Sequence, residues 1–205
     1  MSYRTYPRPP REHAEMAQEV LSRHARATGE PVSFPVPIDM IIEQTYRLQI
    51  LWDEIEERDG QRILGTLSPR QRTIVLNTSH QEMFERWIGP ERFTLAHELA
   101  HWVYDADDPS QMTLDLASDG DQRYCYHHES PGLSEVQRIR EVNANNLAAN
   151  LLMPEHLVRA ESTDDVLADV SGTAREWQVS RRALSIRLKE LRMLDNWDTE
   201  RSLFD

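Results

Sequence analysis

The sequence is poor in the features that mark secreted and membrane-spanning proteins. Its one cysteine, Cys125, cannot form an internal disulfide, and disulfides are typical of oxidising compartments. No apolar run reaches the roughly 18 residues that a transmembrane helix needs. Prolines and charges follow Met1, where a signal peptide would have an apolar segment. These absences favour a cytoplasmic protein without membrane segments.

Positive charge is also scarce. The chain has 23 Lys and Arg against 35 Asp and Glu, a net charge of -12, which argues against nucleic-acid binding by the chain as a whole. Residues 171–194 differ, because six basic minus two acidic side chains give them a net charge of +4. The acidic remainder could favour a basic partner, or it could serve only solubility.

The most informative motif is His-Glu-x-x-His at residues 97–101, within an apolar stretch that can form a helix. At about 3.6 residues per turn, His97 and His101 project from one face of the helix and can share a metal ion. Glu98 is the next residue round the helix, where a carboxylate could take a proton from water and return it to a leaving amine. The pattern predicts a zinc site with Glu98 as the general base.

The alternative to a zinc site is a chance pattern on a helix whose histidines simply pack or lie on the surface. Two features favour the metal. Pro90 and Glu91 suit the first turn of a helix. Imidazoles and a carboxylate are costly to bury beside Phe93 and Leu95 unless something satisfies them, and a metal ion does so.

Residues 133–153 predict a second helix, because Ser134 and Gln137 form a capping box after a Pro-Gly turn and a proline marks the end. A catalytic zinc ion usually has three protein ligands, and Glu141 in this helix is the candidate for the third. Asn145, one turn further on, could hydrogen-bond the other atom of a ligand side chain. The alternative is a helix with a solvated glutamate.

The remaining periodicities predict a small sheet before the motif helix. We expect helices at 11–28, ended by Gly29, and at 37–45, a half-buried strand at 46–52, and strands at 62–67 and 73–76. Gly65 within a strand would let another backbone come near. The fold class is therefore α+β, with a small, mostly antiparallel sheet packed on the zinc-binding helices.

A long polar connection is expected between the two helices, at residues 105–132. Four of its side chains are candidates for stabilising an oxyanion or for gating the site: Tyr124, Tyr126, His127 and His128. Cys125 could instead occupy the open position on the metal and hold the protein inactive. A mobile surface loop with a chance histidine pair is the plainer interpretation of each residue.

The C-terminal part predicts three short helices over residues 163–192. Ser180 suits the start of the last one, and the spacing is that of a helix-turn-helix. Such a unit could contact DNA or a substrate through Arg181 and Arg182, with Ser185 as a further DNA contact. The alternative, which we favour, is that the unit only packs on the rest of the protein, since a net charge of +4 on an acidic chain gives little phosphate affinity.

The two motif blocks resemble the ImmA/IrrE family of metallo-endopeptidases. In that family, a Phe-Thr-Leu-Ala-His-Glu-x-x-His helix precedes a helix with Glu, two residues, Ala-Asn and a Leu-Leu-Met-Pro ending. Here these are residues 93–101 and 141–154, and the resemblance extends over about residues 35–192. Two departures are Ala100, where the family usually has glycine, and Asn143, where it often has a second glutamate.

The resemblance implies a gluzincin-like peptidase core with zinc held by His97, His101 and Glu141. It also implies that the substrate is a helix-turn-helix transcriptional repressor, cut to derepress stress, phage or mobile-element genes. Two other functions stay open: a non-proteolytic regulator that binds DNA or protein, and a toxin–antitoxin component whose zinc site serves partner binding. The intact ligand set with Glu98 favours the enzyme.

The length of 205 residues suits one medium domain plus a small appendage. We expect a zinc peptidase domain over residues 1–160, of which 1–10 are disordered. A helix-turn-helix-like unit should follow at 161–194, and a loose acidic tail at 195–205.

Overall fold

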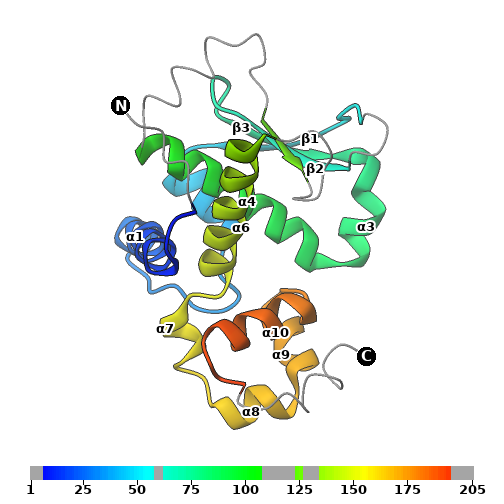
Figure 1. Cartoon of the computed structure of the whole chain (residues 1–205). Helices are drawn as coiled ribbons and strands as arrows, with labels where there is room; N and C mark the ends of the chain where they lie inside the picture. Colours follow the sequence, from blue (N-terminus) through cyan, green and yellow to red (C-terminus); the bar gives the residue numbers. More distant parts are fainter. Residues whose placement is uncertain (1–6, 58–61, 108–122, 127–133, 195–205) are drawn as a thin grey trace.

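A four-stranded mixed sheet covers one side of the protein in the computed structural model (Figure 1), which describes residues 7–57, 62–107, 123–126 and 134–194. The strands, in the order β1-β3-β2-β4 across the sheet, are β1 (Gln49–Asp53), β3 (Thr73–Asn77), β2 (Ile63–Ser68) and β4 (Arg123–Tyr126). β1 pairs with β3 in parallel, whereas β2 pairs antiparallel with both β3 and β4. The predicted mostly antiparallel sheet is therefore confirmed.

Helices make up most of the remainder and confirm the α+β class. In chain order they are α1 (Pro10–Thr28), α2 (Ile38–Met40), the π-helix η1 (Ile41–Thr45), the 3-10 helix η2 (Thr78–His80), α3 (Gln81–Arg86), α4 (Ile88–Asp107), α6 (Glu135–Leu152), α7 (Glu155–Val158), α8 (Thr163–Ala168), α9 (Val170–Glu176) and α10 (Arg181–Glu190). The single short helix expected at 37–45 is thus one α-helical turn followed by a wider π-helical turn. No helix in the described part of the chain is long and apolar enough to cross a membrane.

The first strand differs from its prediction. Alternating apolar residues predicted a half-buried strand at 46–52, but β1 begins at Gln49 and forms an edge of the sheet. Leu51 is 51% exposed and Trp52 42% exposed, while Leu48, just before the strand, is buried. An edge strand has one neighbour instead of two, so its side chains have less to pack against.

Helix α1 forms as the periodicity predicts and packs on α6. Its C-cap is Gly29, which adopts the left-handed conformation (φ 78°) and donates its N–H to the carbonyl of Ala25. The buried face is formed by residues spaced three, four and seven apart: His13, Ala17, Val20, Leu21 and His24. α1 therefore covers one side of the helix that contains Glu141.

The motif helix α4 lies against the sheet, where β2 comes unusually close to it. A Cβ atom at Gly65 would lie 2.7 Å from the Thr94 methyl group and 3.1 Å from the carbonyl oxygen of Val75. Only glycine fits between them without displacement. The close approach predicted for Gly65 is therefore real, and its nearest neighbour is a side chain of α4.

Helices α4 and α6 form an extensive contact in the described structure, and small side chains allow it. Ala100 on α4 and both Ala144 and Ala148 on α6 are completely buried. Alanine at position 100 is thus accommodated where the family usually has glycine. Helix α6 begins at the predicted capping box, in which Ser134 and Gln137 each bond the backbone N–H of the other.

The C-terminal helices α8, α9 and α10 lie below the rest of the protein in Figure 1 and share its hydrophobic core. The Ser180 side chain caps α10 by accepting the N–H of Ala183, as predicted. The apolar face of α10 is buried, and Trp177 stacks on Phe34 with ring centroids 3.9 Å apart. This unit is therefore packed onto the body through apolar and aromatic contacts.

Residues 7–10 were expected to belong to a disordered lead, yet the structure places Arg8 against α4 and α6. The Arg8 N–H donates to the Asn143 side-chain oxygen at 2.9 Å, and the Arg8 guanidinium lies 4.8 Å from the Tyr104 ring centroid. α1 then begins at Pro10. Residues 1–6 and the expected tail at 195–205 lie outside the described residues.

Candidate metal centre

The centre is built on α4, where His97 and His101 stand one helical turn apart. Their Nε2 atoms are 3.0 Å apart, and the two rings meet edge to face at an interplanar angle of 78°. Both side chains are buried. The helix thus points two imidazole nitrogens at one place inside the protein.

Glu141 on α6 brings a carboxylate to the same place. Its Oε2 lies 3.2 Å from His97 Nε2, and its Oε1 lies 3.4 Å from His101 Nε2. The three side chains are buried, and their ligand atoms all lie within 4.8 Å of one another. Among the described residues, this is the only group of three histidine, cysteine or carboxylate side chains so placed.

The separations fit a bound metal ion. Ligand atoms that hold zinc tetrahedrally at about 2.0–2.2 Å are themselves about 3.3–3.6 Å apart. The two Nε2 atoms are 3.0 Å apart, and they lie 3.2 and 3.4 Å from the two different oxygens of Glu141, so these separations are close to this range. Imidazole nitrogen and carboxylate oxygen are also the donor types that zinc prefers. The cluster can therefore hold a metal ion after only a small rearrangement of these side chains.

The protonation states also suit a cation. Burial lowers the pKa of His101 from 6.5 to about 4, although the hydrogen bond to Glu141 opposes this shift. Burial alone would raise the pKa of Glu141, but its hydrogen bonds to the two histidines hold it at about 2. At neutral pH the cluster thus contains a neutral His101 and a charged Glu141, the forms in which these side chains bind metals.

Asn145 orients one of the histidines. Its Oδ1 lies 2.9 Å from His97 Nδ1, so His97 donates its Nδ1 proton to the amide oxygen. A neutral imidazole with its proton on Nδ1 has a lone pair on Nε2. That nitrogen faces His101 and Glu141. Asn145 therefore fixes the tautomer that a metal ligand requires.

Glu98 lies between the two histidines in sequence, but its carboxylate is not part of the three-residue cluster. It is completely buried on α4. A carboxylate beside a metal ion and not bound to it is suited to proton transfer. The geometry therefore separates Glu98 from Glu141 in position, as the sequence interpretation separated them in role.

The connection after α4 is not the continuous loop that the sequence predicted. Helix α4 continues to Asp107, and β4 pairs with β2 over residues 123–126. Tyr124 and Tyr126 belong to this strand, as does Cys125, but their side chains are not among those described. His127 and His128 lie outside the described residues. The oxyanion, gating and thiolate roles of these residues remain predictions.

The proposed DNA contacts on α10 divide into two groups. Arg182 is exposed and Arg181 half-buried, but Ser185 is completely buried and donates to the backbone oxygen of Arg181. The suggestion that Ser185 contacts DNA is therefore wrong, because the residue faces the interior. The start of α10 also lies against α4, since a Cβ atom at Gly89 would be 2.7 Å from the Ser180 nitrogen.

The sequence interpretation missed the contacts that hold the N-terminal half of α6 in place. Tyr104, one turn after His101, donates its hydroxyl proton to the Asn143 backbone oxygen at 3.1 Å and lies 2.6 Å from His13 Nδ1. The side chain of Asn143 binds Arg8. Asn143 was the one signal available, because it replaces a glutamate that the family often has.

Comparison with known proteins identifies the class to which this centre belongs. The family description Peptidase_M78, the IrrE N-terminal-like domain, matches residues 56–189. The chain therefore belongs to this metallopeptidase-like family, as its two motif blocks predicted. The match includes α4, α6 and the C-terminal helices to within α10. No curated protein matches the chain.

Proposed function

We propose that the chain is a zinc-dependent endopeptidase that cleaves a helix-turn-helix transcriptional repressor. The observation that carries the enzymatic part is the buried cluster of His97, His101 and Glu141, whose ligand atoms all lie within 4.8 Å of one another. The family of the chain supports hydrolytic chemistry at that cluster. The proposal goes further in naming zinc as the metal and a repressor as the substrate.

The roles follow from the positions of the side chains. His97, His101 and Glu141 would hold the ion, and Asn145 would keep His97 in the correct tautomer. When bound, zinc supplies Lewis acidity that polarises a carbonyl group and lowers the pKa of water. Glu98 would take a proton from the attacking water and deliver it to the leaving amine.

The sheet offers a place for an extended substrate. Its two edges are β1 and β4, and of these β4 contacts the motif helix α4. A peptide that adds to an edge strand is held extended by its own backbone hydrogen bonds. We therefore propose that the scissile bond lies in a loop or a locally unfolded segment of the repressor, not in an intact helix.

The repressor as substrate rests on two observations about charge and family. DNA-binding proteins are basic on one face, and the net charge of -12 on this chain would attract such a partner. The resemblance to the ImmA/IrrE family implies the same target class. Cleavage would then release the repressed genes, which gives the protein a part in transcription regulation or stress response.

Mass spectrometry of a candidate repressor after incubation with the zinc-loaded protein tests the proposal. A repressor encoded next to this gene is the first candidate. We expect a single cut, lost in Glu98→Gln and retained in Glu135→Gln, which makes the same chemical change at an exposed glutamate on α6. Casein should be a poor substrate. Many scattered cuts or strong casein digestion would indicate a general peptidase and remove the regulatory part.

The second candidate function is a regulator that binds DNA through α8, α9 and α10. The net charge of +4 over residues 171–194 favours it. Helix-turn-helix proteins insert the N-terminal part of the recognition helix into the major groove, and here that part of α10 lies against Gly89 of α4. Ser185 is also buried. These contacts support a packing or substrate-recognition role for the unit.

A further inference from the structure

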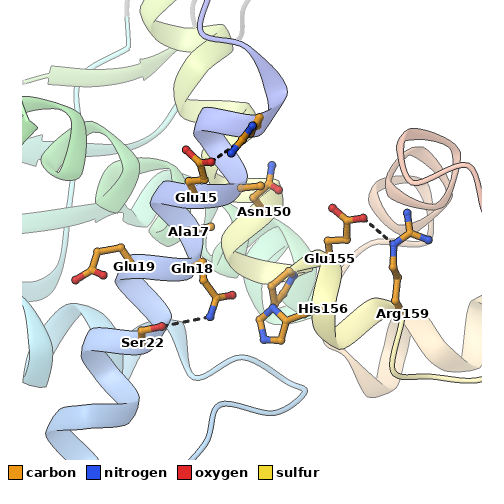
Figure 2. A pocket seen from close by; sticks show the side chains of 12 residues that line it. Glu15, Ala17, Gln18, Glu19, Ser22, Asn150, Glu155, His156 and Arg159 are labelled. Carbon is orange, nitrogen blue, oxygen red and sulfur yellow. Dashed lines mark hydrogen bonds and ion pairs between the residues drawn. The ribbon is translucent and has the colours of Figure 1, made fainter.

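Two open places on the described surface differ in how far their polar groups are satisfied. In the groove of about 580 Å³ between α1 and the α6–α7 junction (Figure 2), several polar side chains pair with one another. Gln18 donates to Ser22 there, and Arg159 donates to Glu155. The outer edge of β1 instead presents backbone groups, which no strand among the described residues covers. Open backbone at a sheet edge is a template for another strand.

The contacts of β1 show which of its backbone groups face this edge. Gln49 donates its N–H to the Arg72 carbonyl, which directly precedes β3. Because the peptide groups of successive strand residues point to opposite sides, those of Ile50 and Trp52 point away from β3. The start of the strand is covered, since the N–H of Leu48 donates to η1. The open part of the edge therefore begins at Ile50.

β1 lacks the features that usually protect an edge strand. Such strands are protected by lysine, proline or a bulge. The sequence Gln-Ile-Leu-Trp-Asp has neither lysine nor proline, and its register with β3 is continuous. Leu51 is 51% exposed and Trp52 42% exposed. Trp52 also packs edge to face on Phe84 of α3, with ring centroids 5.6 Å apart, so its position is fixed. The edge is thus an ordered apolar strand that another strand can join.

Charge is distributed unevenly along this edge. The exposed Arg47 precedes β1, whereas the exposed Asp53 ends the strand and the exposed Glu54 follows it. A strand that is basic before its start and acidic at its end matches a copy of itself that runs in the opposite direction. A uniformly basic segment would meet Arg47 as well as the acidic end. The charges therefore favour a second copy of the chain in antiparallel orientation.

We propose that β1 pairs antiparallel with β1 of a second copy of this chain, across a two-fold axis at Leu51. In this register Ile50 lies opposite Trp52 of the partner subunit, and the two residues exchange the backbone hydrogen bonds that β3 leaves free. Aromatic and β-branched side chains also form favourable pairs across adjacent strands. Arg47 would lie diagonally across from Asp53 of the partner subunit, within reach of a long side chain.

This interface uses the edge of the sheet opposite to β4, the edge that contacts the motif helix α4. Each copy would therefore keep its own metal centre and its own β4 edge. A two-fold interface between identical surfaces closes on itself, so assembly would stop at the dimer. The dimer goes beyond the proposed proteolysis and does not depend on it.

Sedimentation velocity on the full zinc-loaded chain at increasing protein concentration tests the proposal. We expect a reversible monomer–dimer equilibrium with a dissociation constant of about 1–100 µM, because a short strand pair gives a small interface. Leu51→Lys places two like charges on the axis and should weaken the dimer at least about tenfold. Ile186→Lys, the same kind of change at a 45% exposed residue on α10, is the control and should keep the dimer. Circular dichroism checks that both variants are folded.

A chain that is still monomeric at about 1 mM would overturn the proposal. The same holds for a dimer that Leu51→Lys leaves intact.

A charge swap tests the antiparallel orientation. Arg47→Asp or Asp53→Arg alone would bring like charges together and should weaken the dimer about tenfold. The double variant restores opposite charges and should recover the dissociation constant of the unmodified chain. Aspartate tolerates the left-handed backbone of Arg47 (φ 53°), so the first variant should fold. A double variant that dimerises as weakly as the single ones would contradict antiparallel pairing.

A disulfide tests the register. Leu51→Cys would place two thiols on the axis, in a non-hydrogen-bonded pair whose Cα atoms are about 4.5 Å apart, and this separation allows a disulfide. Gln49→Cys, on the same face of the strand, would lie about 13 Å from its counterpart and is the matched control. Only Leu51→Cys should form a covalent dimer with oxidised glutathione, and peptide mass spectrometry distinguishes this link from one through Cys125. Equal cross-linking of both variants, or none in Leu51→Cys, would refute the pairing.

Discussion

Helix α6 buries charged side chains in two places, and the two places are built differently. Near its start, Glu141 faces two histidines in a cluster that could hold a metal ion. At its end, Asn150 and the Met153 carbonyl accept N–H groups of the buried Arg187 from α10. The first place gathers three side chains that could each bind a cation, whereas the second pairs the N–H donors of Arg187 with acceptors.

This difference teaches how a buried charge is to be interpreted. Burial of a charge requires compensation in both places. Around Arg187 the protein itself supplies all of this compensation. The contact therefore serves to hold the C-terminal helices against the body. Around Glu141 all three side chains are possible metal ligands, and a bound cation would compensate the buried carboxylate. The kind of group that a buried charge faces, more than burial itself, thus indicates a functional site.

The strongest test of the comparison removes a ligand from the metal cluster. We expect one zinc ion per chain, and His97→Ala should lose it, since two ligands hold zinc far more weakly than three. Metal analysis by mass spectrometry measures the stoichiometry. His156→Ala, at an exposed histidine on α7, is the matched control. Full zinc content in His97→Ala would show that the cluster is not the site.

Changing Glu98 should separate catalysis from metal binding. Glu98→Gln keeps the shape of the side chain but cannot accept a proton, so the rate of repressor cleavage should fall about 10²–10⁴-fold. The zinc content should stay the same, because Glu98 is not in the cluster. If this variant loses its metal instead, the roles assigned to Glu98 and Glu141 must be exchanged.

Changing Arg187 tests the contact between α10 and the C-terminal end of α6. Arg187→Met should lower the free energy of unfolding by about 2–3 kcal/mol, because Asn150 and the Met153 carbonyl lose a charged donor. Denaturant unfolding measures the change, and the exposed Arg182→Met serves as the control. Zinc affinity should be unaffected. Loss of zinc in Arg187→Met would mean that the two places on α6 are coupled.

A smaller effect is expected at Asn145. Asn145→Ala removes the acceptor for the His97 Nδ1 proton and should weaken zinc binding about 10–100-fold. Asn145→Asp keeps an acceptor at that position and should restore most of the affinity. Competition with a zinc chelator gives the dissociation constants. Equal affinity in the alanine variant would show that packing alone orients His97.

The smallest effect is expected for the arginines at the start of α10. If the C-terminal unit packs or recognises substrate, Arg181→Ala combined with Arg182→Ala has little specific DNA binding to remove. Gel-shift measurements with operator DNA at physiological salt check this expectation. Sequence-specific binding that the double variant abolishes would establish the regulator function in place of the packing role.

Most secondary structure could be predicted because the signals for it are local. The capping box at Ser134, the left-handed Gly29 and the apolar spacing of α1 and α10 each depend on neighbours a few residues away. The predictions that failed concern what surrounds a residue in the folded protein. The alternation around β1 is real, but its position at the sheet edge leaves Leu51 and Trp52 exposed. Ser185 has the sequence context of a contact residue and faces the core.

The sequence by itself determined that His97 and His101 form a pair, since a helix places residues four apart on one face. It also determined the family, through the spacing of its two motif blocks. Only the tertiary structure decided that Glu141 meets that pair and that Asn145 binds His97, because these contacts join helices far apart in the chain. The same holds for the buried Arg187 and its contacts with the end of α6. The local sequence pattern decides which residues share one face of a helix. Only tertiary packing decides which other residues that face contacts.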